Sequence, residues 1–421
     1  MRVVVTSHGS TGDIFPLIAL GVALRDAGHS VGFATSPPFR TEIERAGLEY
    51  IDLPPRWSRE ELAFWMGRLQ RFATPLMQLR ELYRAALPHI TALIDEMDRA
   101  LAGTDVLVSS YLFPMNRAIA ARQGVKFATF AFAHNTVPSR FYPPEGFPRL
   151  RYFPRGLQHT WNRWCWRAGN VAVDTTINLT IARHLRARGL PAVRDFFSKP
   201  AELVLVGVSP GLMRPSFPLN RRFRYVGFSR WQAATDDALD REIEAFTTGT
   251  AVPVLTFGSM VYADPEAWMR RLVAAWPAGR KIIIQRGWSG FPPPAASHIK
   301  LIGAVSHEQL FRHASVVVHH GGAGTTATVL HTGRPQVVVP HIADQNFFAN
   351  EIVRLGCGRK LRRKEWPERL ATEIQRVLDE PAFARAAEQA RRVMRSECGS
   401  LAAVHELEQF VGVPSAHADA K

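Results

Sequence analysis

Cysteine is scarce in this chain, which has three among its 421 residues: Cys165, Cys357 and Cys398. They lie far apart in the sequence, and their spacing matches no metal-binding motif. We therefore expect no metal site built on cysteine, and we interpret the three side chains as free thiols of a cytoplasmic protein.

Long apolar runs are also missing. No stretch approaches the roughly 20 apolar residues that a membrane-spanning helix needs, and the mean hydropathy is -0.08. The first residues, Met1–Thr6, form a short apolar run without a cleavage motif, which indicates a strand and not a signal peptide. These absences predict a cytoplasmic location, with association at the inner face of the membrane left open.

Acidic residues are fewer than basic residues in this chain. Aspartate and glutamate number 37 against 52 lysines and arginines, which gives a formal net charge of +15 and a pI of about 10.4. Nucleic acid, an anionic membrane or an anionic small molecule would each explain this charge, and so would a merely solvated cationic surface. Because the sequence has no recognised nucleic-acid motif, we expect no nucleic-acid partner, while peripheral association with an anionic membrane stays open.

The chain does contain enough apolar material for two or three cores, because 46% of its residues are hydrophobic. Its β-branched runs, turns and helical patterns are typical of parallel α/β sheets. The most informative stretch, Val316–Thr326, reads VVVHHGGAGTT. We predict a buried strand, a tight turn and a helix there, followed by another strand at Val337–Val339.

This turn has the composition of an anion-binding site. Glycine lets a bulky ligand approach the backbone, and the unpaired amides that open a helix carry the positive end of its dipole. Such a terminus binds phosphate, and His319 at the strand tip would add a charge-assisted bond. The alternative is a turn that needs glycine for packing alone.

Residues 319–326, together with Pro340, Asp344 and Gln345 after the next strand, resemble the donor-binding signature of family 1 glycosyltransferases, which in bacteria typically reads HHGGAGTT. The opening GSTGD at residues 9–13 resembles the GSxGD segment of the bacterial enzymes that glycosylate antibiotics and sterols or form rhamnolipids. The resemblance implies the GT-B fold, an α/β architecture of two Rossmann-like domains facing each other across a cleft. It also implies a nucleotide-sugar donor and metal-independent, inverting transfer of a sugar.

The resemblance also implies a division of the chain. We expect an acceptor-binding domain at 1–208, a linker at 209–239 and a nucleotide-sugar-binding domain at 240–395. A final helix at 396–413 should pack back on the first domain, and 414–421 should form a tail.

The donor site is expected at the carboxyl edge of the second sheet, where open α/β sheets bind ligands. By resemblance Asp344 and Gln345 hold the sugar, while Val305 and His307 lie in the loop that meets the base. The alternatives are a helix cap without a ligand for Asp344 and a solvent-exposed helix residue for His307. The predicted donor contacts are Ser10, Gly12, Gly258, Ser259, Val305, His307, His319, Gly321, Ala323, Gly324, Thr325, Asp344 and Gln345.

Sugar transfer also requires a base for the acceptor proton. The resemblance assigns this role to Asp13, at the end of the first turn, with His8 as the runner-up. A closed cleft would raise the pKa of Asp13 and make it a stronger base. The alternative for Asp13 is an N-cap of the helix that follows.

The acceptor is expected to bind in the first half of the chain. A helical apolar stripe occurs near Leu62, and residues 142–166 are rich in proline, arginine and aromatic side chains. An aromatic-lined pocket suits a flat or lipidic acceptor, and ordinary core packing is the alternative. The predicted acceptor region comprises Leu62, Trp65, Met66, His134, Phe147 and Trp161.

The sequence has no Asp-x-Asp triplet. Such a pair is a common way to hold a divalent metal on a diphosphate, so we expect no metal and no cofactor besides the nucleotide sugar. The donor is either UDP-glucose-like or dTDP-rhamnose-like. Two other functions compete: a nucleotide-sugar 2-epimerase, which shares the GT-B architecture, and a non-catalytic membrane-surface protein that keeps the fold.

Overall fold

The computed structural model of the chain describes residues 1–421 except 73, 151, 213–221, 232–234, 343 and 414–421. The described residues form two compact units. The first contains Met1–Ser229 and the chain from Cys398 onward, and the second is Arg230–Glu397. The boundary at Ser229 falls inside the predicted linker, and the predicted tail, 414–421, lies outside the described residues.

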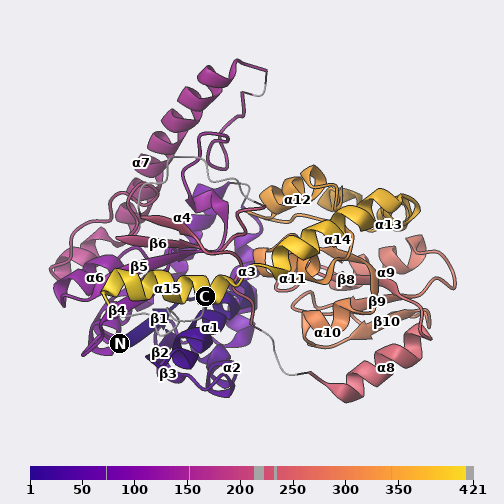
Figure 1. The fold of residues 1–421 in the computed structure, drawn as a ribbon, viewed down its shortest axis with the longest axis horizontal. Coiled ribbons are helices and arrows are strands. Elements are labelled where there is room, and N and C mark those ends of the chain that lie inside the picture. The colour runs from indigo at the N-terminus through magenta and orange to yellow at the C-terminus, as the bar shows by residue number, and fades with distance from the viewer. Residues whose placement is uncertain (73, 151, 213–221, 232–234, 343, 414–421) are drawn as a thin grey trace. The chain divides into compact units, whose positions relative to one another are not determined.

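The first unit is built on a seven-stranded parallel sheet with the strand order β3-β2-β1-β4-β5-β6-β7 (Figure 1). Its strands are β1 (Arg2–Thr6), β2 (Ser30–Thr35), β3 (Glu49–Asp52), β4 (Val106–Ser110), β5 (Lys126–Ala131), β6 (Leu203–Val206) and β7 (Phe223–Tyr225). The last strand, β7, lies in the segment that we interpreted as a linker. It belongs to the sheet because it pairs with β6 as a further parallel strand.

Helices cover this sheet and connect its strands. They are α1 (Thr11–Asp26), α2 (Arg40–Arg45), α3 (Arg59–Leu69), α4 (Pro75–Ala86), α5 (Ile90–Ala100), α6 (Asn116–Arg122), α7 (Arg155–Ala187) and α15 (Gly399–Val411). Short 3-10 turns lie at η1 (Pro37–Phe39), η2 (Leu87–His89) and η3 (His134–Thr136). The β-branched residues of β1, Val3 to Val5, are fully buried between the helical layers, as expected for a parallel strand covered on both faces.

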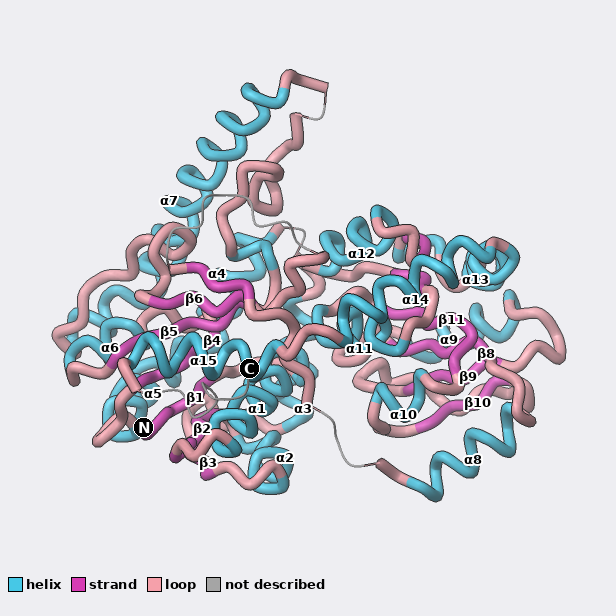
Figure 2. Tube along the Cα trace, in the orientation of Figure 1, coloured by secondary structure: helices cyan, strands magenta, loops and turns pink. Residues whose placement is uncertain are grey.

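Two helices of the first unit connect distant parts of the sequence. Helix α15 packs against α1, and a buried hydrogen bond of 3.0 Å joins the His29 ring to the Glu408 carboxylate. Helix α7 packs against α4, and its N-terminal turns extend beyond the sheet (Figures 1 and 2). No helix within the described ranges is both long and apolar enough to span a bilayer.

The second unit holds a six-stranded parallel sheet with the order β10-β9-β8-β11-β12-β13. Its strands are β8 (Val252–Thr256), β9 (Ile282–Gln285), β10 (Ile299–Ile302), β11 (Ala314–His319), β12 (Gln336–Val338) and β13 (Gly358–Lys360). Its helices are α8 (Asp237–Thr247), α9 (Pro265–Ala275), α10 (His307–Phe311), α11 (Ala323–Thr332), α12 (Gln345–Arg354), the 3-10 turn η4 (Arg363–Glu365), α13 (Leu370–Asp379) and α14 (Pro381–Arg395).

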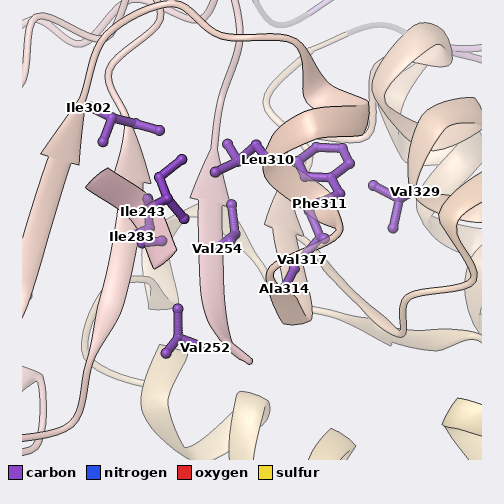
Figure 3. Close-up of a cluster of buried hydrophobic side chains, with 10 residues drawn as sticks. All are labelled: Ile243, Val252, Val254, Ile283, Ile302, Leu310, Phe311, Ala314, Val317 and Val329. Carbon is purple, nitrogen blue, oxygen red and sulfur yellow. The ribbon is translucent and has the colours of Figure 1, made fainter. Parts of the chain in front are cut away.

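Buried apolar side chains hold three helices of this unit on its sheet (Figure 3). The cluster brings strands β8 to β11 together with α8, α10 and α11; its members are Ile243, Val252, Val254, Ile283, Ile302, Leu310, Phe311, Ala314, Val317 and Val329. Burial at this scale fixes the position of α11 and therefore of the turn before it. The predicted α/β class, with one parallel sheet in each half of the chain, is confirmed.

Candidate active site

Two turns lie side by side at the carboxyl edge of the second sheet. Strands β8 and β11 are parallel neighbours, and their register places His319 beside Thr256. The turn after β8 contains Gly258 and Ser259, and the turn after β11 contains His320 and Gly321. A Cβ added to Gly258 would lie 3.1 Å from Cε1 of His320, so the two turns are in close contact. The structure thus places these predicted donor residues together.

His319 is fully enclosed, and both of its ring nitrogens are occupied. The backbone N–H of Gly321 donates to Nδ1 (3.1 Å), and Nε2 lies 2.8 Å from Oε1 of Gln336. Because Nδ1 accepts a hydrogen bond, Nε2 carries the proton and donates to Gln336. Burial lowers the pKa of His319 to about 4, so the ring is neutral at pH 7.

This geometry changes the role predicted for His319. His319 cannot form the expected charge-assisted bond to a phosphate, because its ring is neutral and both ring nitrogens are already hydrogen-bonded. Instead, the ring holds the amide of Gly321 and thereby shapes the turn that follows. Gln336, which opens β12, fixes the tautomer of the ring, a long-range partner that the sequence did not reveal.

The three glycines of the turn have different functions. Gly321 has φ +89°, and a Cβ there would lie 2.9 Å from the backbone oxygen of Gln345. A Cβ on Gly322 would lie 2.4 Å from Nε2 of His320. Packing therefore explains both positions. A Cβ on Gly324 would meet nothing within 4 Å among the described atoms, so packing does not explain this glycine.

Gly324 lies in the first turn of α11, where the backbone donors point out of the helix. Gly322 is the N-cap and has no side chain to accept from them. The first amide with an intrahelical bond is that of Thr326, which donates to the Gly322 oxygen (2.9 Å). The amides of Ala323, Gly324 and Thr325 precede it, and at a helix start they have no intrahelical acceptor. These donors, the helix dipole and the open space at Gly324 can accommodate an anion.

The residues predicted to hold the sugar lie at the start of α12, but Gln345 is already engaged. Its Oε1 accepts hydrogen bonds from the backbone amides of His341 (2.8 Å) and Ile342 (3.0 Å), and its Nε2 lies 3.4 Å from Sδ of Met260. It is buried and holds the loop after β12 in place. Asp344 is the half-buried N-cap residue, and its side chain does not cap the helix.

His307 is half-buried, contrary to the exposed alternative. Its ring stacks on Phe311, with centroids 4.9 Å apart, and its Nε2 lies 3.0 Å from Oε1 of Gln285. Gln285 also accepts a bond from the Thr256 hydroxyl (2.8 Å) and donates to the backbone oxygen of Val305 (3.0 Å). This network fixes the loop of Val305 to the ends of β8 and β9. Burial lowers the pKa of His307 to about 4.

One group of described residues has a spacing that would suit a metal ion: Asp240, Glu244 and His313. Asp240 is already paired with the His313 ring (2.8 Å) and with Arg312. His313 immediately precedes β11, so this group lies at the amino edge of the sheet, opposite to the donor turn. These ion pairs indicate a structural role.

In the first unit, the GSTGD segment folds into the start of α1. Ser10 is the N-cap, and both its backbone N–H (2.8 Å) and its hydroxyl (3.0 Å) donate to Oδ2 of Asp13. Asp13 is therefore the N3 residue of a capping box and not the N-cap that we considered. A Cβ on Gly9 would lie 2.4 Å from Oδ2, so glycine makes room for the carboxylate. Gly12 lies beside them, exposed on the first turn of the helix.

The other carboxylate oxygen of Asp13, Oδ1, has no hydrogen-bond partner among the described residues. Burial raises the pKa of Asp13, and the two bonds from Ser10 partly offset this effect. The geometry therefore leaves one carboxylate oxygen, of increased basicity, to accept a proton.

His8 is buried and also oriented by a partner. Its Nδ1 lies 3.1 Å from Oγ of Ser36, and the Ser36 hydroxyl donates to the backbone oxygen of Pro55 (2.6 Å). Ser36 thus accepts from His8, which leaves the lone pair on Nε2. That Nε2 is buried without a partner among the described residues. Because burial lowers the pKa of His8 to about 4, its ring is a weak base.

The predicted acceptor residues do not all reach the surface. Leu62 is 4% exposed and belongs to the core, so it can neither line an open pocket nor face a membrane. Trp65, Met66 and Phe147 are half-buried.

The remaining two lie on different elements. Trp161, on α7, is half-buried, stacks on Trp164 and donates from Nε1 to the Pro148 oxygen (2.9 Å). His134 lies in the 3-10 turn η3, and its side chain is outside the described part of the structure.

Sequence reasoning missed the polar partners that position these residues: Ser36, Thr256, Gln285 and Gln336. Gln285 closes an otherwise apolar strand of three isoleucines. A polar residue at the carboxyl end of such a strand is the signal that could have identified it.

Two family models match the chain. Residues 3–98 match the N-terminal domain of glycosyltransferase family 28, and residues 293–410 match the C-terminal domain of erythromycin biosynthesis protein CIII-like proteins. The glycosyltransferase GtfE of Amycolatopsis orientalis is 30% identical over 366 residues, which cover 85% of each chain. The sterol 3-beta-glucosyltransferase of Yarrowia lipolytica is 29% identical over 437 residues, covering 95% of this chain and 28% of that protein.

Solved structures show the same fold along nearly the whole chain. The glycotransferase of kitacinnamycin superposes with a TM-score of 0.69 at 18% identity, covering 98% of this chain and 99% of that one. The glycosyltransferase SsfS6 of Streptomyces sp. SF2575, complexed with thymidine diphosphate, has a TM-score of 0.65 at 20% identity, covering 97% and 99%. These likenesses confirm the expected GT-B fold.

Proposed function

Because the chain belongs to the family 1 glycosyltransferases of the GT-B fold, we propose that it transfers a hexose from a nucleotide diphosphate sugar to a hydroxyl group of a hydrophobic small molecule or lipid. The enzyme inverts the anomeric carbon and requires no metal. The donor is UDP-glucose-like or dTDP-rhamnose-like.

The observation that carries the proposal is the open space at Gly324. Gly321 and Gly322 are needed for packing, but Gly324 is not, although it lies between the free amides that open α11. A diphosphate bound there would receive backbone hydrogen bonds and the favourable end of the helix dipole. The complex of the structurally similar SsfS6 with thymidine diphosphate supports this class of ligand.

The same donors supply what a metal supplies in other transferases. As the sugar leaves, negative charge develops on the diphosphate, and preorganised amides stabilise such charge without reorganising. The sequence has no Asp-x-Asp pair to hold a cation on the diphosphate. These two features support metal-independent transfer.

Asp13 removes the proton from the acceptor hydroxyl as the oxygen attacks the anomeric carbon. Its Oδ2 is held by Ser10, which orients the carboxylate, while Oδ1 accepts the proton. The carbon–oxygen bond to the diphosphate breaks as the new glycosidic bond forms on the opposite face, so a single displacement inverts the configuration. The acceptor lies against Trp65, Met66, Phe147 and Trp161, which suits a large apolar molecule. The vancomycin aglycone glucosyltransferase of Amycolatopsis orientalis, 29% identical over 368 residues, supports an acceptor of this size.

Product analysis tests the proposal. The enzyme is incubated in EDTA with UDP-glucose or dTDP-rhamnose and with a panel of sterol, hydroxylated lipid and polyphenol acceptors. We expect a product whose mass increases by one hexose or deoxyhexose residue, and an anomeric configuration opposite to that of the donor by NMR. Donor epimerised at C2 without an acceptor would instead support the epimerase. A product with retained configuration would contradict inversion.

A further inference from the structure

The N-terminal end of α7 exposes apolar side chains to solvent. Tyr152 and Phe153, just before the helix, are 99% and 52% exposed, and Leu157 and Trp164 on its first turns are 56% and 57% exposed. Leu157 and Trp164 are seven residues apart and therefore share one face of the helix. Figures 1 and 2 show these turns extending away from the sheet of the first unit. We define the end of α7 and these residues before it as the α7 tip.

The loop before α7 is held firmly against the helix. Three side chains of the helix donate to backbone oxygens of this loop: Trp161 to Pro148 (2.9 Å), Asn162 to Arg140 (2.8 Å) and Trp166 to Tyr142 (3.0 Å). These hydrogen bonds fix the loop to the helix that carries the exposed apolar side chains.

The charge around the tip is mainly positive. The sequence has no aspartate or glutamate from 146 to 173, whereas arginine occurs at 149, 151, 155, 163 and 167. Arg140 and Arg155 line a pocket of about 460 Å³ together with Phe141, Gln158 and His159. No ion pair is found for Arg140 or Arg155 within the described residues, so both guanidinium groups are available to an anionic group.

These features fit one partner better than others. Two copies of this arginine-rich surface would repel each other, because Glu145 is the only acidic residue in the sequence from 140 to 173. A bilayer with anionic headgroups attracts arginine and also accepts exposed aromatic and aliphatic side chains at its interface. Single-stranded nucleic acid would stack on the aromatic rings but would not favour exposed Leu157.

We propose that the α7 tip docks on the surface of an anionic phospholipid bilayer. Tyr152, Phe153 and Leu157 enter the interface, and the pocket between Arg140 and Arg155 receives a lipid phosphate. This surface adjoins the predicted acceptor region, because Trp164 of the tip stacks on Trp161. It would bring the enzyme to lipid-dissolved acceptors.

Vesicle cosedimentation tests the docking. The full chain is mixed with vesicles of phosphatidylcholine alone or with phosphatidylglycerol, in the absence of any sugar donor. We expect binding only to the anionic vesicles, weakening as salt is raised. The double variant Arg140→Glu/Arg155→Glu should lower the partition coefficient by about thirty-fold or more, from the typical effect of a basic residue near an anionic surface. Tyr152→Ser/Phe153→Ser should weaken binding even at low salt.

Matched controls carry equal changes elsewhere on the surface. Arg385→Glu/Arg392→Glu alters the net charge by the same amount on exposed positions of α14, and Val393→Ser/Leu401→Ser removes two exposed apolar side chains. Both controls should bind anionic vesicles nearly as the parent does, and all variants should melt at the parental temperature.

Several results would overturn the proposal. Equal binding to neutral vesicles, or equal losses in the tip and control variants, would show that the tip is not an anionic-lipid surface. Competition by 10 mM free inorganic phosphate with full loss of vesicle binding would assign the pocket to a soluble anion. Tip-dependent binding of a labelled oligothymidine without vesicle binding would assign the surface to nucleic acid, and a dimer in sedimentation velocity that the tip variants abolish would assign it to a second copy.

Discussion

Asp13 illustrates how a single residue can be both part of a helix start and a reactive group. Its Oδ2 accepts two hydrogen bonds from Ser10, and its Oδ1 accepts none from the described residues. A carboxylate held by one oxygen has a fixed orientation, and burial raises its pKa, so the second oxygen is a better proton acceptor than that of an exposed aspartate.

We therefore expect Asp13→Asn to lower kcat by about 10²–10⁴, the usual contribution of a positioned base. Asparagine keeps an oxygen that can accept the bonds from Ser10, so the melting temperature and donor affinity should change little. Steady-state kinetics and thermal unfolding provide the measurements. His8→Gln is the comparison: near-parental turnover in Asp13→Asn together with its loss in His8→Gln would make His8 the base.

At the residue scale, the sequence predicts the positions of the candidate site more accurately than it predicts the role of each residue there. The HHGGAGTT and GSTGD segments are local, and their residues do gather at strand ends. The partner of His319 is Gln336, 17 residues away on a neighbouring strand, and that of His307 is Gln285, 22 residues away. Such pairings depend on strand register, which no local pattern encodes.

At the scale of elements, the glycines before and at the start of α11 have different roles. Packing requires Gly321 and Gly322 but does not require Gly324. Gly321 has a positive φ and no room for a Cβ, whereas Gly324 has a helical environment and open space. Leucine has a far higher helix propensity than glycine, so a large side chain at 324 should not destabilise the helix.

We expect Gly324→Leu to leave the melting temperature unchanged or slightly higher while weakening UDP or dTDP binding at least tenfold, because the side chain fills the approach to the amides. Gly321→Ala should lower the melting temperature instead, since the left-handed backbone and the contact with Gln345 cannot accommodate it. Differential scanning calorimetry and nucleotide titration separate the effects. Tight nucleotide binding by Gly324→Leu would argue that the turn is only a packing device.

The elements themselves follow from the sequence where their signals are strong. The strand β11, the turn and helix α11 that follow it, and the strand β12 are predicted and observed. The strand β7 is three residues long and follows the prolines at 210, 215 and 218, so its signal is weaker than that of a linker. Its place in the sheet comes from pairing with β6.

At the scale of the whole molecule, buried neutral histidines couple stability to pH. Burial lowers the pKa of both His8 and His319 from 6.5 to about 4. Above pH 6.5 neither state binds these protons, and stability is unaffected. Between about 6.5 and 4 the unfolded chain takes up protons that the folded chain does not, so stability falls as the pH falls.

Each such histidine should cost about 1.4 kcal/mol of unfolding free energy per pH unit within that window. Urea unfolding at pH 7, 6 and 5 measures the slope. His8→Gln should reduce the change in unfolding free energy per pH unit for the first unit. His405→Gln, at an exposed position of α15, should leave this dependence unchanged. A parental slope in His8→Gln would mean that His8 is protonated in the folded protein.

The central claim is that the turn after β11 binds a nucleotide diphosphate through backbone amides without a metal. Isothermal titration calorimetry of UDP and dTDP into the full chain, in EDTA and again in excess Mg²⁺, tests it most directly. We predict one site per chain for at least one of the two nucleotides, with the same Kd in both buffers. Binding that appears only with Mg²⁺, or no binding of either nucleotide, would contradict the account.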